Sequence, residues 1–305
     1  MPVFRSRRAL GVAAALLASV SAGASALEGA QSAQPRPTTA ILVDKATNTL
    51  QLVEYRGGAY LPLKTFHATL GKALGDKERE GDLRTPEGIY TFKSVLKPPS
   101  LRPKFGAMAF NIDYPNTFDR MSGRTGSAIM LHATDTPERL KLDYDSEGCV
   151  VIENGQIREI ESGIRLGLTP ILIFPELTEQ YRNPGRDAGL KAFFDGWIRA
   201  WESRDVEEYI RFYHSGFSAK GMDRSRWKTY KSGLTRMYSS IRIGPEDVRI
   251  YSHPKYSMIT FTQNYESKRQ GGGWGHRSRG TKILYVGREA GDPKIIAETY
   301  TDLMW

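Results

Sequence analysis

Two residues suited to nucleophilic chemistry lie close together in the sequence. Cys149 is the only cysteine of the 305-residue chain; it follows Gly148, and His132 precedes it by seventeen residues. A thiolate is the nucleophilic form of cysteine, and a nearby imidazole can accept the thiol proton. The pair therefore predicts acyl transfer through a thioester, provided that the fold brings the two side chains together.

A purely structural role is the alternative for both residues. A lone cysteine usually behaves as a small buried hydrophobe, and a lone histidine is usually a polar group with satisfied hydrogen bonds. The spacing of Cys149 and His132 leaves this alternative open, because a motif needs a structural context before it identifies a site.

Short apolar segments on either side predict the strands that would position the pair. The segment 127–132 (SAIMLH) would place His132 at the end of one strand, and the segment 149–152 (CVVI) would begin another at Cys149. If these strands pair, the loop between them brings both side chains to one edge of a sheet.

This stretch resembles the signature of the L,D-transpeptidase (YkuD-type) family of cell-wall enzymes. The signature is a histidine, a variable loop and then Ser-x-Gly-Cys, matched here by His132, Ser146, Gly148 and Cys149. A second patch, 75–92 (GDKEREGDLRTPEGIYTF), has the Thr-Pro-x-Gly turn of the family and is most similar to the YafK-like branch. The resemblance covers residues 38–175 and implies that they form the catalytic domain.

The resemblance implies an enzyme that acts on the peptide stems of peptidoglycan. Cys149 would attack the carbonyl at the L-centre of diaminopimelate in a tetrapeptide stem, so that D-alanine leaves. Transfer of the acyl group to an amine gives a cross-link, which is the L,D-transpeptidase reaction that we expect. Transfer to water gives a tripeptide, which is the alternative L,D-carboxypeptidase reaction with a role in cell shape. A non-catalytic wall-binding module is a third, less favoured hypothesis.

Residue chemistry suggests a role for each member of the signature. His132 would remove the thiol proton and later protonate the leaving amine. Gly148 would let the backbone approach the reacting carbonyl, and the amide of Cys149 would donate to the oxyanion. Ser146 would either orient His132 or cap backbone groups of the turn.

The sequence departs from the family pattern at three positions near the pair. Many relatives have glycine, histidine and arginine where this chain has Ala133, Glu147 and Val151. The missing arginine removes one expected holder of a substrate carboxylate, so the pose of the substrate stays open.

Three carboxylates precede the cysteine, at positions 143, 145 and 147. Negative neighbours raise the pKa of a thiol, but they also favour a protonated imidazole, which would favour a thiolate–imidazolium pair. Which effect dominates depends on distances that the sequence does not contain.

The N-terminus is typical of an export signal. Arginines at positions 5, 7 and 8 precede an apolar run over residues 9–20 and a small-residue site, Ala24-Ser25-Ala26. We therefore expect residues 1–26 to be a signal peptide cleaved after Ala26 and the mature chain to be periplasmic, without stable membrane insertion. An uncleaved anchor is the alternative. Residues 27–37, with two prolines, predict a flexible leader.

The residue counts also bear on cofactors. An exported chain with one cysteine cannot form an internal disulfide, so the free thiol is a candidate reactive group. The five histidines form no H-E-x-x-H motif, and a single cysteine cannot build a zinc site. We expect neither a metal nor an organic cofactor.

The pattern of residues 38–175 predicts a mainly β catalytic domain, and the family resemblance implies an L,D-transpeptidase-type β-sandwich. Apolar runs rich in β-branched and aromatic residues predict strands at 39–44, 49–56, 60–70, 88–95, 107–113 and 169–175. Asn154 would cap a short helix over residues 155–165.

A second domain is predicted after a linker at 176–187. Apolar residues at helical spacing in 188–214, with a break near 203–205, predict two helices. Strand-like segments follow at 248–253, 257–267, 281–287 and 294–303, and the segment 271–275 (GGGWG) reads as a hairpin loop. Residues 188–305 therefore predict an α+β domain, which resembles the nuclear-transport-factor-like (SnoaL-like) cone. Cell-shape-determining relatives are similar in pairing such a domain with the catalytic one.

The positive charge belongs to this second domain. Residues 188–305 hold 20 Lys and Arg against 13 Asp and Glu, a balance of +7 within the +9 of the whole chain. Nucleic acid is not expected outside the cytoplasm, whereas peptidoglycan stems carry free carboxylates. The domain is thus predicted to bind anionic wall polymer, unless its charge serves only solubility. The residues expected to bind it are the cations Lys228, Lys231, Arg236 and Arg242, with the aromatics Trp227, Tyr230, Tyr238, Tyr265 and Trp274.

Overall fold

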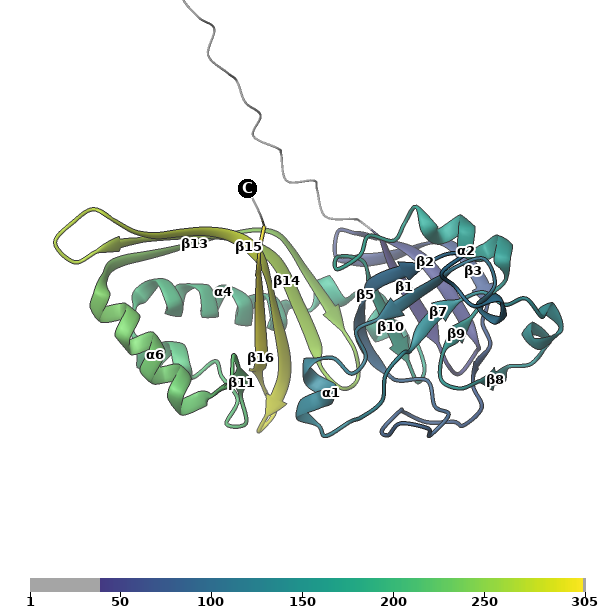
Figure 1. The fold of residues 1–305 in the computed structure, drawn as a ribbon. Helices are drawn as coiled ribbons and strands as arrows, with labels where there is room; N and C mark the ends of the chain where they lie inside the picture. Colours follow the sequence, from purple (N-terminus) through teal and green to yellow (C-terminus); the bar gives the residue numbers. More distant parts are fainter. Residues whose placement is uncertain (1–38, 304–305) are drawn as a thin grey trace, which may run out of the picture. The chain divides into compact units, whose positions relative to one another are not determined.

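The computed structural model describes residues 39–303 (Figure 1). The predicted signal peptide (1–26) and leader (27–37) lie outside the described residues. No helix in the described range is long and apolar enough to cross a membrane.

The first half of the chain builds an eight-stranded sheet. Its strand order is β3-β2-β1-β10-β5-β6-β7-β9, with parallel pairing at β1–β10 and β7–β9 and antiparallel pairing elsewhere. The strands are β1 (Thr39–Asp44), β2 (Thr49–Arg56), β3 (Ala59–His67), β5 (Gly88–Leu96), β6 (Ala109–Ile112), β7 (Met130–His132), β9 (Val150–Val151) and β10 (Pro170–Phe174). The predicted mainly β catalytic domain is confirmed, and each strand expected between residues 39 and 175 is present.

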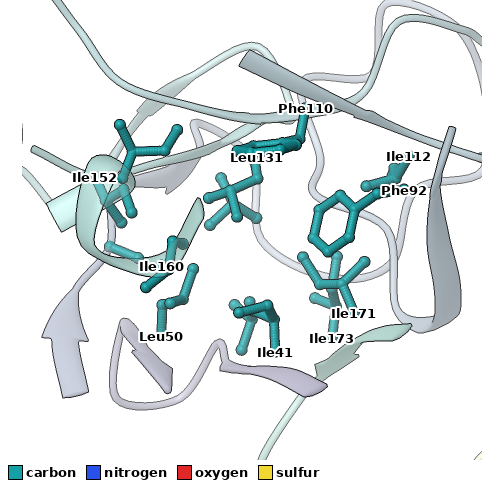
Figure 2. Close-up of a cluster of buried hydrophobic side chains, with 14 of the residues drawn as sticks. Ile41, Leu50, Phe92, Phe110, Ile112, Leu131, Ile152, Ile160, Ile171 and Ile173 are labelled. Carbon is teal, nitrogen blue, oxygen red and sulfur yellow. The ribbon is translucent and has the colours of Figure 1, made fainter. Parts of the chain in front are cut away.

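The core of this half lies between the two halves of the sheet, which meet where β10 pairs with β5. Figure 2 shows side chains of β1, β2 and β10 facing those of β5, β6 and β7, with the helix α2 (Asn154–Glu161) closing one side. Strand β1 is buried on both faces: Ile41 and Val43 join this core, whereas Ala40 and Leu42 face the other way. Alternation of side chains along a strand explains this division, because the period of a strand is two residues.

Short elements around β7 and β9 complete the region of the predicted site. Strand β4 (Leu70–Gly71) pairs in parallel with β8 (Tyr144–Ser146), just before the cysteine. Two 3-10 helices lie nearby in the chain: η1 (Pro103–Phe105) connects β5 to β6, and η2 (Pro137–Lys141) connects β7 to β8.

The second half is an α+β domain, as predicted. Helices α4 (Ala188–Ser203) and α5 (Val206–Ile210) precede a four-stranded antiparallel sheet, β13 (Tyr238–Ser252), β14 (Ser257–Arg269), β15 (Trp274–Glu289) and β16 (Asp292–Asp302). Helix α4 lies against β13 (Figure 1), and aromatic side chains of both helices fill the core beneath the sheet. Arg204 ends α4 in the left-handed conformation, which explains the predicted break near residues 203–205.

One helix was missed by the sequence interpretation, which expected only strand-like segments after Arg226. Helix α6 (Arg224–Met237) occupies this region, after a small hairpin of β11 (Ser218–Ala219) and β12 (Met222–Asp223). Only Trp227 and Lys231 of α6 are buried, so the helix has no apolar periodicity to reveal it. The sequence signal for the start of α6 is a local one: Asp223 is a favoured N-cap residue, and its side chain caps the first turn of the helix.

The segment 176–187 is more ordered than its pattern suggested. It contains the short helices α3 (Glu179–Arg182) and η3 (Pro184–Arg186). Leu177 in this predicted linker is buried, at 6% exposed, and packs in a core cluster.

That cluster contains residues from both halves of the chain. It joins Ala40, Leu42, Val53, Tyr60, Ile89, Leu172, Phe174 and Leu177 to Tyr251, Tyr256, Met258, Tyr285, Ile296 and Ala297. The outer face of β1 and β10 is therefore covered by the second domain.

Candidate active site

Strands β7 and β9 bring the cysteine and the histidine to the same edge of the sheet. The strands pair in parallel, with Leu131 opposite Val150 and His132 opposite Val151, so that Cys149 enters β9 beside the strand that ends at His132. Strand β9 is the last of the sheet, and both side chains line one cavity of about 560 Å³. The predicted strand pairing is confirmed.

His132 is held in one orientation by two neighbours. Its ring is 7% exposed, and its Nδ1 hydrogen-bonds the carbonyl oxygen of Ala133. The ring of Phe105 meets it edge to face, with centroids 4.9 Å apart. A carbonyl can only accept a hydrogen bond, so Nδ1 carries the proton in the neutral ring and Nε2 is left as the base.

The environment of His132 keeps the imidazole neutral. Burial lowers its pKa to about 4; the Ala133 carbonyl opposes that change, while Arg139 and Lys104 add to it. The ring is therefore an unprotonated base at neutral pH.

Cys149 is in its neutral form in the free protein. Its side chain is half-buried and packs against the cluster of Leu101, Ala109 and Met130, and its Sγ lies 3.8 Å from the carbonyl oxygen of Ala128. Burial raises the pKa of the thiol to about 11, and Glu147 adds to this rise, whereas Lys104 lowers it. Desolvation by burial thus has a larger effect on both pKa values than the neighbouring charges have. The resting state is a thiol and a neutral imidazole.

The acidic residues before the cysteine have different surroundings. The carboxylate of Asp145 is paired with Arg139 and lies 3.6 Å from Lys72, while Asp143 lies 3.6 Å from His67. Of these three carboxylates, only that of Glu147 adds to the effect of burial in raising the pKa of the thiol.

Gly148 is required by a contact inside the protein. Its φ is +119°, and a Cβ at this position would lie 2.6 Å from the carbonyl oxygen of Arg84. On sequence alone, the missing Cβ of Gly148 is expected to let the backbone approach the reacting carbonyl of the substrate. The structure instead fills this space with the backbone of the segment 76–85.

Ser146 caps the turn that presents the cysteine. Its hydroxyl donates to the carbonyl oxygen of Cys149 at 2.7 Å and accepts from the amide of Gly148 at 3.1 Å. Of the two roles proposed for Ser146, these bonds support the cap, and the Ala133 carbonyl orients His132 in its place.

Cations line this cavity, and sequence reasoning did not identify them as part of the site. Lys72, Lys77, Lys104 and Arg139 line it together with Glu80, Asp145 and Glu147. Lys77 pairs with Asp82 at 2.7 Å, whereas no carboxylate in the described range pairs with Lys104, whose ammonium lies 5.0 Å from the centre of the Phe105 ring. Lys104 is therefore free to bind an anionic group, and nothing in its local sequence marks it.

Two positions that depart from the family pattern have structural roles. Ala133 is fully buried and supplies the carbonyl that holds His132. Val151 lines the cavity and pairs with Thr69, so the expected arginine is replaced by an apolar side chain.

Comparison with known families assigns each half of the chain separately. The L,D-transpeptidase catalytic domain (YkuD) matches residues 38–173, and the Cds6 C-terminal NTF2-like domain matches residues 189–299.

Three relatives extend these matches. YafK of Escherichia coli (strain K12), a candidate L,D-transpeptidase by its curated name, is 32% identical over 181 residues, covering 56% of this chain and 67% of YafK. The structure of Bd1075 from Bdellovibrio bacteriovorus is 32% identical with a TM-score of 0.74, covering 88% of this chain and 94% of Bd1075. The helical cell shape determining protein Pgp2 of Campylobacter jejuni shares the fold, at 23% identity and a TM-score of 0.67 over 87% of this chain and 91% of Pgp2.

Proposed function

Because the chain belongs to the L,D-transpeptidase family, with a YkuD-type catalytic domain followed by an NTF2-like domain, we propose that it is an exported cysteine L,D-transpeptidase that modifies peptidoglycan. Its substrate is a tetrapeptide stem, and the bond broken joins diaminopimelate to D-alanine. The observation that carries this proposal is the cavity that Cys149 and a neutral His132 line together.

The reaction begins with transfer of the thiol proton of Cys149 to His132, which does not occur in the free protein. The thiol of Cys149 has a raised pKa and the imidazole of His132 a lowered one, so the ion pair forms only as the thiol attacks. Nε2 of His132 accepts the proton as sulfur bonds to the carbonyl carbon. The amide of Cys149 donates to the oxyanion.

Collapse of the tetrahedral intermediate yields the acyl-enzyme. The bond from the carbonyl carbon to the D-alanine nitrogen breaks, and the imidazolium of His132 gives its proton to that nitrogen. The leaving group carries a carboxylate, and Lys104 is the cation of the cavity available to bind it. Neutral His132 then activates the nucleophile that releases the thioester.

The acceptor decides the product. An amine of a second stem gives a cross-link and makes the protein a transpeptidase. Water gives a tripeptide, which is the carboxypeptidase alternative by the same acyl-enzyme. Both reactions use the same groups, so the product distinguishes them.

Location in the periplasm is part of this proposal. It is supported by the arginines, apolar run and small-residue site within residues 1–26, with cleavage after Ala26. Peptidoglycan is assembled outside the cytoplasm, so export would bring the protein to its proposed substrate.

Mass analysis of purified tetrapeptide muropeptides incubated with the mature protein tests the reaction. Cross-linked dimer supports the transpeptidase, tripeptide the carboxypeptidase, and unchanged substrate contradicts both. Cys149→Ala should abolish all product, because it removes the nucleophile and leaves a side chain of similar volume. His132→Asn should lower the rate by about a hundredfold or more, the usual contribution of a positioned general base.

The NTF2-like domain supports a second function, the binding of anionic wall polymer. It has a cavity of about 340 Å³ in which Lys231 and Lys282 lie near Glu298. The ammonium of Lys231 lies 4.0 Å from the centre of a ring of Trp201, and burial lowers its pKa to about 7. When Lys231 is protonated, two lysines face the single carboxylate of Glu298 and leave an excess positive charge, which suits a carboxylate ligand between aromatic faces.

This cavity revises the surface that the sequence suggested. Trp227, Tyr230, Tyr238 and Tyr265 line it, whereas Trp274 lies elsewhere, over Arg277. Among the proposed cations only Lys231 lines the cavity, while Lys228 pairs with Glu207. The recognition site is thus a pocket with a single buried cluster of charge.

Co-sedimentation of full-length Cys149→Ala protein with insoluble peptidoglycan tests this second function. Lys231→Met in that background should reduce the sedimented fraction, whereas Arg242→Met, which changes a cation outside the cavity, should not. Equal sedimentation of both variants would show that the pocket is not the binding site.

A further inference from the structure

A balanced ion cluster lies beneath the segment 76–85 of the active-site cavity. Its members are the carboxylates of Asp76, Glu87 and Asp119 and the cations Lys45, Arg124 and Lys255. Their side chains are at most 18% exposed, and that of Asp119 is fully buried. Five of the six belong to the catalytic half. Lys255 alone comes from the NTF2-like domain.

The cluster holds both ends of the segment. Lys45 donates to the carbonyls of Gly75 and Thr85, at 2.5 and 2.9 Å, and to the carboxylate of Glu87. Asp76 accepts from the amide of Glu87 at 2.8 Å. The two ends of the segment are therefore hydrogen-bonded to each other and to Lys45, the residue that follows β1.

Lys255 also contacts the residues at the two ends of the segment. Its Nζ lies 2.8 Å from the carboxylate of Asp76 and 2.5 Å from the carbonyl oxygen of Glu87. It lies 3.9 Å from Asp119, as does Arg124. Without Lys255, the carboxylates of Asp76 and Asp119 would share Arg124 alone and leave an uncompensated buried charge.

The turn that carries Lys255 is anchored in the catalytic half. It connects β13 to β14, and the hydroxyl of Tyr256 bonds the amide and carbonyl of Ile89 and the side chain of Asn116. Nε2 of His253 hydrogen-bonds the carbonyl of Ile173 at 2.9 Å. The position of Lys255 is thus fixed by buried contacts on both sides of it.

The far side of the segment forms a wall of the active site. Lys77, Glu80 and Leu83 line the cavity, and the carbonyl of Arg84 lies against Gly148. Arg124 also donates to the carbonyl of Lys77, so the cluster and the cavity wall are linked by one hydrogen bond. Lys255 is therefore connected to the turn of the nucleophile through Asp76, Arg124 and the segment 76–85, which contacts Gly148.

We propose that Lys255 is a positioning residue through which the NTF2-like domain holds the segment 76–85 against Gly148 and the nucleophile Cys149. The second domain then has a part in the reaction besides any ligand of its own. The proposal rests on the proposed function for its effect on turnover, but its effect on the segment can be measured without substrate.

Hydrogen exchange followed by mass spectrometry measures that effect directly. In Lys255→Met, amides of residues 76–88 should exchange at least about tenfold faster, the change expected when a buried charge loses its partner. Exchange in α4 and β15 should stay unchanged. Lys191→Met, a change on the exposed surface of α4, is the matched control and should behave as wild type.

Rescue separates positioning from general loss of structure. Asp119→Asn added to Lys255→Met removes the unpaired carboxylate and restores the charge balance, so exchange in residues 76–88 and product formation should both recover. Lys255→Arg, which keeps the charge, should stay near wild type in both. If Lys255→Met fails to fold, these two variants carry the test.

Wild-type exchange in residues 76–88 of folded Lys255→Met would overturn the proposal, as would failure of Asp119→Asn to restore it. Exchange could respond as expected while wild-type protein forms no product from muropeptides. In that case the proposed reaction is wrong, but the role of Lys255 in holding the segment 76–85 is supported.

Discussion

The carbonyl oxygen of Arg84 occupies the place of a side chain on Gly148. A Cβ there would lie 2.6 Å from that oxygen, closer than nonbonded atoms approach. The turn before the nucleophile and the segment 76–85 are therefore packed backbone to backbone, and the sulfur of Cys149 depends on a wall that is distant in sequence.

Gly148→Ala should disturb this contact. The added methyl group meets the Arg84 carbonyl, and a φ of +119° is strained for alanine. We expect product formation to fall by at least about tenfold, since strain of this kind costs about 1–3 kcal/mol. Gly155→Ala, where a Cβ meets nothing within 4 Å, is the control and should leave the rate unchanged. Equal rates for both variants would mean that the turn is not held by Arg84.

Alkylation of Cys149 by iodoacetamide should report a neutral resting state. With a thiol pKa of about 11 and an imidazole pKa of about 4, the rate should rise with pH through the neutral range and level off only in strong alkali. A preformed thiolate–imidazolium pair would instead give a plateau at neutral pH. The measurement is the pseudo-first-order rate against pH in the free protein, and such a plateau would contradict our assignment.

Lys104→Met should weaken substrate binding. Its ammonium is paired with no carboxylate in the described part of the chain, and the proposed leaving group is an amino acid with a free carboxylate. Loss of one charge-assisted hydrogen bond should raise KM about tenfold or more, with a smaller effect on kcat. Lys141→Met, at an exposed position outside the cavity, provides the comparison. An unchanged KM would remove Lys104 from the substrate site.

Acid should destabilise the fold in part through His253. Burial lowers its pKa to about 3, so the unfolded chain binds this proton at a higher pH than the folded one. Stability is therefore lost as pH falls from about 6.5 toward 3, at up to about 1.4 kcal/mol per pH unit for one histidine. His253→Gln should make the fall in unfolding free energy shallower between pH 5.5 and 4, as measured by urea denaturation. His67→Gln, at an exposed position, should not alter it.

Local pattern was enough to predict most elements. Strands such as β1 and β2 have the predicted bounds because each is rich in β-branched and apolar residues and is followed by turn residues. Helix α6 was missed because its polar surface gives no periodic signal. The break after α4 was visible, whereas the helices between 176 and 187 were not.

The site was predictable in its residues but not in their environment. Motif spacing named His132 and Cys149, and strand pairing placed them. The burial that sets their pKa values, the carbonyl of Arg84 beside Gly148 and the free cation of Lys104 all depend on segments far away in sequence. Such contacts leave no local signature, so neither the role of Ser146 nor the ionisation of the pair followed from the motif.

The two buried faces of β1 bear on how this protein can be shortened. Ala40 and Leu42, with Ile89 and Leu172 beside them, are covered by side chains of the NTF2-like domain. A chain that ended at Phe174 would expose this apolar surface to water, and large exposed apolar surfaces promote self-association. Truncated protein should therefore precipitate or form oligomers, unless charged substitutions at these positions make the exposed face soluble.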